Sequence, residues 1–193
     1  MLQTFKARHP RVLLRVSLSS RLVDLVDEGI DVAFRLHVAP LPDAASLKLI
    51  RVLRVAAHFY AAPSYLAALG RPFRRVDLSR HPYVCHARAP RKALLGKPGD
   101  AEQLLPEPDI VVNSFASVIE IVGRGLGIGL IPEFLAEPHV ASGSLERVLA
   151  SAKSPQGWLS MVWPASRQGQ PRVEKFIAVV TELSRPTRGP RST

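Results

Sequence analysis

The pattern of apolar and polar residues is most regular between residues 109 and 132, where two strand signals flank a helix signal. The apolar, β-branched run Ile110–Val112 predicts a strand buried on both faces. From Phe115 onward the apolar residues recur at helical spacing, which predicts a helix with one face packed on a sheet. Residues 128–131 form a second apolar run, and Pro132 ends it by removing a ladder donor. The segment therefore predicts a strand–helix–strand unit.

Four alternate glycines lie between this predicted helix and the second strand: Gly123, Gly125, Gly127 and Gly129. A dinucleotide-binding loop requires a strand before its glycines and a helix amino terminus after them. Here the order is reversed, so backbone carbonyls and the negative end of the helix dipole face the turn. The glycines therefore predict helix termination rather than phosphate binding, with positive φ expected at Gly125, Gly127 or both.

Residues 8–36 repeat the same pattern. Residues 12–18 are apolar and β-prone apart from Arg15, and the apolar positions of residues 22–26 cover one face of a helix. Gly29 closes that helix, and residues 31–36 form the next predicted strand. The segment predicts a second strand–helix–strand unit, with a right-handed crossover.

Polar residues stand where each predicted helix begins. Open α/β sheets bind ligands outside the carboxyl ends of their strands, and helix amino termini there favour anions. Both considerations predict effector contacts at five residues: Ser19, Ser20, Asn113, Ser114 and Phe115. Their hydroxyl and amide groups favour a small anion, with a carboxylate as the expected class. Helix capping alone remains an alternative at each of the serines and at Asn113.

Composition limits the function in two respects. The net charge of +10, with 26 Lys and Arg against 16 Asp and Glu, could indicate nucleic-acid binding, but the basic residues are scattered and lack interleaved aromatic residues. A solvated basic surface is the favoured interpretation. Cys85 is the only cysteine, which excludes an intramolecular disulfide, and its position in an apolar run favours burial. No apolar run reaches the length of a membrane span, and the amino terminus lacks the apolar core of a signal peptide.

Motifs for catalysis or cofactor binding do not stand out. The sequence has no Gly-x-Ser-x-Gly elbow, no His-x-x-x-His pair and no pair of cysteines. Cys85 and His86 are adjacent on a predicted strand, so their side chains point to opposite faces and cannot chelate one ion. We therefore expect no enzymatic activity, metal or cofactor.

Three blocks of sequence resemble one known family. The run GRGLGIGLIP, with SGSLERVL downstream at residues 142–149, resembles the regulatory domain of LysR-type transcriptional regulators. Residues 8–36 are similar to the family's strand, turn and helix leading to an EGxDxAxR strand, and AAPSYLAALGRP at residues 61–72 resembles its SPxYLxxxGxP turn. The blocks occur in family order, and the similarity runs from about residue 5 to residue 183.

The resemblance implies a two-lobed α/β domain of the periplasmic-binding-protein-like fold. Residues 1–55 with 162–184 would form the first lobe, residues 56–161 the second, and residues 185–193 a disordered tail. A small-molecule effector would bind between the lobes and shift the population of conformations. The complete family member would be a cytoplasmic homo-oligomer with no membrane association. DNA would be a partner only through a winged helix-turn-helix that these residues do not include.

The family pattern also predicts that the first lobe is incomplete. In the resembling domains a strand and most of a helix precede the segment equivalent to residues 5–12, and that strand lies between the two strands predicted at 12–18 and 31–36. We therefore expect the first lobe to lack its first strand and the isolated chain to be marginally stable. Two alternatives share the fold: a solute-binding protein, which would need an export signal, and a small-molecule enzyme.

Overall fold

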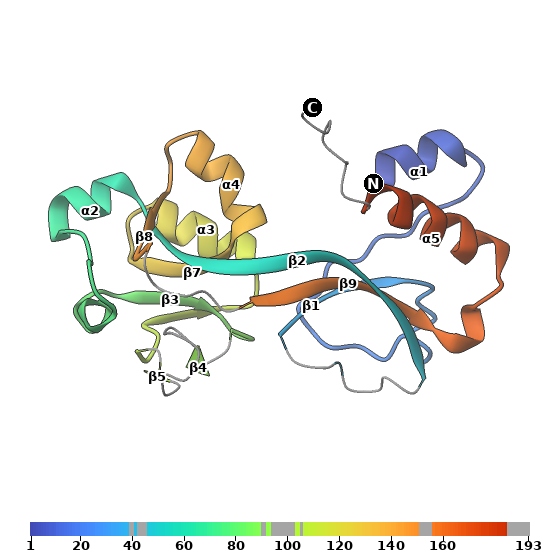
Figure 1. The fold of residues 1–193 in the computed structure, drawn as a ribbon, viewed down its shortest axis with the longest axis horizontal. Coiled ribbons are helices and arrows are strands. Elements are labelled where there is room, and N and C mark those ends of the chain that lie inside the picture. The colour runs from blue at the N-terminus through green and yellow to red at the C-terminus, as the bar shows by residue number, and fades with distance from the viewer. Residues whose placement is uncertain are drawn as a thin grey trace, which may run out of the picture. The chain divides into compact units, whose positions relative to one another are not determined.

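A computed structural model describes residues 1–38, 41, 46–89, 92–93, 103–104, 106–150 and 156–184. The chain divides into two compact units, and Figure 1 shows the elements of each. Unit 1 comprises Met1–Arg54 with Gly157–Thr193, and unit 2 comprises Val55–Gln156. The assignment of these units as ligand-binding lobes stays a prediction. The tail predicted at residues 185–193 lies outside the described residues.

Unit 2 is built on a mixed sheet in the strand order β2-β7-β3-β6. The strands are β2 (Leu47–Ala61, of which the second half belongs to this unit), β7 (Ile128–Pro132), β3 (Tyr83–His86) and β6 (Ile110–Val112). Strand β3 is parallel to both β6 and β7, whereas β7 and the short strand β8 (Glu146–Val148) pair antiparallel with β2. The parallel trio places the carboxyl ends of β3 and β6 at one edge of the sheet.

The strand–helix–strand unit predicted at residues 109–132 is confirmed. Helix α3 (Phe115–Gly123) connects β6 to β7, and β3 lies between these two strands in the sheet. The apolar face of α3 buries Val118, Ile119 and Val122, in a cluster that also contains Val84 of β3. Neighbouring residues on a strand point to opposite faces, so Tyr83 and Cys85 pack in a second cluster on the other face of the sheet.

The turn after α3 ends the helix as its glycines predict. The Gly125 N–H donates to the Val122 carbonyl at 2.9 Å, and the Leu126 N–H donates to the Ile121 carbonyl at 3.3 Å. These two bonds are the Schellman arrangement, in which the residue after the cap takes positive φ. Gly125 has φ +78° and Gly127 has φ +145°, so the prediction of positive φ is confirmed at both positions.

The remaining elements of unit 2 are short. Helix α2 (Pro63–Leu69) and the 3₁₀ turn η1 (Arg75–Arg80) precede β3, and the pair β4 (Lys92–Ala93) and β5 (Gln103–Leu104) follows it. Helix α4 (Glu133–Ala141) was not predicted. Pro138 lies inside α4 and removes one backbone donor, which weakens the helical signal in the sequence.

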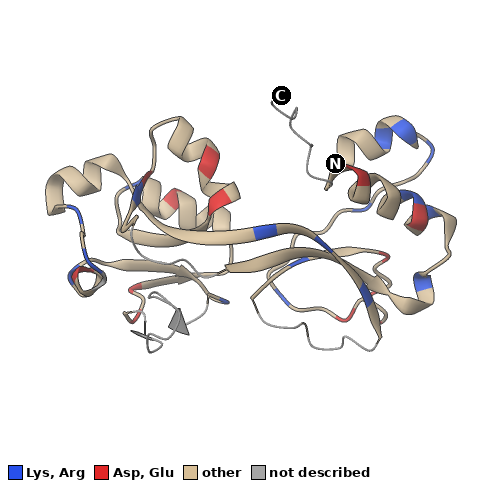
Figure 2. Cartoon of the chain, in the orientation of Figure 1, with Lys and Arg blue, Asp and Glu red and all other residues tan. Residues whose placement is uncertain are grey.

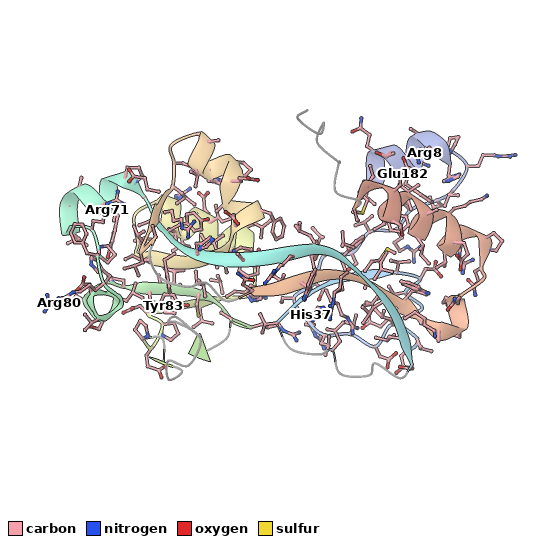
Figure 3. The ribbon with its side chains drawn as sticks, in the orientation of Figure 1. Arg8, His37, Arg71, Arg80, Tyr83 and Glu182 are labelled. Atoms are coloured by element: carbon pink, nitrogen blue, oxygen red, sulfur yellow. The ribbon has the colours of Figure 1, made fainter. Side chains whose placement is uncertain are left out.

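Unit 1 contains strands β1 (Ala33–His37) and β9 (Gln156–Pro164), the first half of β2, the 3₁₀ turn η2 (Ala165–Arg167) and two helices, α1 (Leu2–Arg8) and α5 (Pro171–Leu183). The two helices pack together through Phe5 and Phe176, whose ring centroids are 5.0 Å apart. At their surface Arg8 and Glu182 lie side by side (Figure 3), with two hydrogen bonds of 2.6 and 2.8 Å. Helix α5 is amphipathic and buries one apolar face, made of Val173, Phe176, Val179 and Val180.

The strand–helix–strand unit predicted at residues 8–36 is wrong in its first two elements. Residues 12–18 form no strand, and residues 25–29 form a turn where a helix was expected. Only the last element is present, as β1, and it pairs antiparallel with β9. Among the described residues no strand lies beside residues 12–18, so their backbone has no ladder in which to form one. The expectation that a first strand is missing stays a prediction.

Candidate functional site

The amino terminus of α3 follows directly from the carboxyl end of β6. Ser114 is the N-cap residue, with φ −140° and ψ 130°, but its side chain makes no capping hydrogen bond. The first N–H groups of an α-helix have no acceptor within the helix. The local geometry therefore leaves the Ser114 hydroxyl and the first amides of α3 able to bind an acceptor group together.

His86 meets this turn from the neighbouring strand. It is the last residue of β3 and pairs in parallel register with Val112, the last residue of β6. Its side chain is buried, with 8% of the residue exposed, and its ring stacks on Phe115 with centroids 4.5 Å apart and planes 16° apart. The carboxyl ends of β3 and β6 therefore bring His86 and Phe115 together.

One hydrogen bond holds the His86 ring: Nδ1 accepts the backbone N–H of Arg88 at 3.1 Å. Burial lowers the pKa of His86, the backbone of Asn113 opposes this effect, and the positive charge of Arg88 lowers the pKa further. The net shift is downward, which favours a neutral imidazole at neutral pH.

The five predicted site residues fall into two groups. Asn113, Ser114 and Phe115 lie at the start of α3, with Asn113 exposed and the other two half-buried. Ser19 and Ser20 belong to unit 1, and they do not begin a helix; the Ser19 hydroxyl accepts the Arg21 N–H at 3.1 Å. The helix terminus on which their assignment depended is absent, because residues 22–26 are not helical. Their role as effector contacts stays a prediction.

The sequence analysis missed His86 and Arg88 as parts of this site. His86 was considered only as a metal ligand beside Cys85, and the predicted strand ending at His86 gave no indication of its neighbours. The useful signal was the rule that ligands gather at the carboxyl ends of parallel strands. Applying that rule requires knowing that β3 is parallel and adjacent to β6, which a single strand pattern does not indicate.

A separate pocket of about 390 Å³ opens at the other ends of the same strands. Its lining includes Pro82, which precedes β3, and Asp109, which precedes β6, together with Arg80, His81 and Glu107. One carboxylate oxygen of Asp109 accepts the Tyr83 N–H at 2.7 Å, so this carboxylate already has a hydrogen-bond partner at the start of β3. The pocket therefore lies at the amino edge of the parallel strands, opposite the edge that carries His86.

Other kinds of site are not apparent in the part of the chain that the structure describes. Within it, no three His, Cys, Asp or Glu side chains gather as metal ligands, and no helix is long and apolar enough to cross a bilayer. Figure 2 shows that Lys and Arg are distributed over elements of both units.

The chain belongs to the LysR substrate binding domain family, whose sequence model matches residues 1–185. It is 27% identical over 187 residues to the probable HTH-type transcriptional regulator LtrA of Klebsiella pneumoniae, covering 94% of this chain and 60% of that protein. It is 27% identical over 180 residues to the HTH-type transcriptional regulator PtxR of Pseudomonas aeruginosa, covering 92% and 57%. The chain thus spans 57–60% of the length of these two relatives.

Solved structures confirm the fold class. The regulatory domain of CrgA, a LysR-type regulator from Neisseria meningitidis, matches with a TM-score of 0.82 at 22% identity, over 94% of this chain and 88% of that one. The effector domain of the regulator AmpR from Pseudomonas aeruginosa matches with a TM-score of 0.77 at 24% identity, over 95% and 86%. The chain therefore has the two-lobed α/β fold of LysR-type regulatory domains.

Proposed function

We propose that this chain is the effector-sensing part of a LysR-type transcriptional regulator, and that the segment Asn113–Phe115 binds a small anion, with a carboxylate as the expected class. Membership of the LysR substrate binding domain family supports the general role. The geometry at the start of α3 supports the anion.

The main observation behind the proposal is that the Ser114 side chain makes no capping hydrogen bond. A serine at an N-cap ordinarily accepts an N–H group of the first turn, and Ser114 does not. Its hydroxyl and the first amides of α3 can then donate to one bound group. The positive end of the helix dipole adds a preference for negative charge. A carboxylate suits this arrangement because its two oxygens can accept several of these donors at once.

In the complete regulator, effector binding would favour one conformation of the domain, and a helix-turn-helix outside these residues would convert that change into DNA affinity. The mechanism is a population shift without turnover of the effector. We also propose a cytoplasmic location and assembly as a homo-oligomer, since the relatives carry the names of HTH-type regulators. Ser19 and Ser20 remain proposed effector contacts without support from a helix terminus.

Nuclear magnetic resonance titration of the chain tests the proposed site. Sulfate and a set of small mono- and dicarboxylates, added at constant ionic strength, should shift the amide signals of Ser114 and the first turn of α3. Ser114→Ala should weaken binding about tenfold, because a hydrogen bond to a charged group contributes about 1.5 kcal/mol or more.

Ser142→Ala is the matched control, because Ser142 caps the far end of α4 and bonds only within that region. Equal affinity of the Ser114→Ala variant and the parent chain would refute the assignment of the anion site. Chemical conversion of any of the added carboxylates would favour the enzyme alternative instead.

A further inference from the structure

We draw no further inference here: the strongest candidate, the outer edge of strand β1 in unit 1, where Phe34 and Leu36 are exposed and β9 is the only strand of the described residues that pairs with β1, carries none because nothing in the structure shows what covers it.

Discussion

Gly127 lies directly against the backbone of Pro82, whose carbonyl oxygen accepts the N–H of Ile128 at 2.9 Å. A Cβ on Gly127 would lie 3.0 Å from the Pro82 carbonyl carbon and closer still to its oxygen. Gly127 also has φ +145°, where residues with side chains are strained. The close approach lets β7 begin in register beside β3.

Gly127→Ala should therefore destabilise unit 2 by about 1–3 kcal/mol or more, through backbone strain together with the clash against Pro82. Gly143→Ala is the matched control, since Gly143 has φ +74° but no heavy atom within 4 Å of the added Cβ. Thermal and urea unfolding measure both variants. Equal losses in the two would show that the contact with Pro82 adds nothing to the strain at positive φ.

Unit 2 was largely predictable because its signals are local. The apolar run of β6, the helical spacing in α3 and the glycines after it all lie within residues 109–132. Each element packs on its neighbours through residues that the pattern itself marks, such as Val118 and Val122. What the pattern did not indicate was that β3 lies between the two strands, because order in a sheet depends on contacts far apart in sequence.

Unit 1 shows the limit of the same reasoning. Residues 12–18 have a composition suited to a buried strand, yet Leu13 is 88% exposed and Leu18 is 95% exposed. A strand forms only where a neighbour accepts its backbone hydrogen bonds, and composition does not show whether that neighbour exists. The helix expected after Ser20 would have packed against the strand predicted at residues 12–18. That helix is absent as well.

The sequence predicted the residues of the candidate site that follow β6, but not the one that ends β3. Asn113 to Phe115 follow from the rule that polar residues at a strand end and a helix start favour ligands. His86 lies on another strand, 26 residues earlier in the sequence than Val112, its partner in register. Its contact with Phe115 exists only because β3 and β6 are parallel neighbours, so no local pattern could have predicted it.

Two histidines in unit 2, the buried His86 and the partly buried His58, should make its stability depend on pH. Burial is the largest cause that lowers the pKa of His58, with Arg147 adding to the effect and Glu133 opposing it. Burial also lowers the pKa of His86. For both, the folded pKa lies below the unfolded value of about 6.5, so the unfolded chain binds more protons as the pH falls. Stability is then full above about pH 6.5 and is lost as the pH falls through the folded pKa values.

Urea unfolding between pH 5 and pH 8 measures this dependence. The free energy of unfolding of the parent should decrease below about pH 6.5, and His58→Gln should show a shallower decrease because one titrating group is gone. His139→Gln serves as the control, because it removes a different histidine of unit 2, on helix α4. A decrease that is identical in the parent and in His58→Gln would contradict the assignment to His58.

Substitution of a buried leucine in unit 1 should lower the stability, whereas substitution of the exposed leucines should not. Leu25 is 2% exposed and lies in the turn that replaces the expected helix, so Leu25→Ala should cost about 2–5 kcal/mol by leaving a cavity. Leu13→Ser with Leu18→Ser should leave the melting temperature nearly unchanged, because both side chains are already in water. The same double variant should reduce concentration-dependent association, which exposed apolar side chains promote.

Sedimentation velocity and thermal unfolding, run on the three chains at matched concentrations, measure both effects together. A melting temperature that falls as far in the double serine variant as in Leu25→Ala would mean that residues 13 and 18 are buried in solution. That result would favour the predicted strand at residues 12–18, since Leu13 and Leu18 would point to opposite faces of a strand and their burial requires neighbours on both faces. Reduced association with an unchanged melting temperature would instead agree with the irregular, exposed segment of the structure.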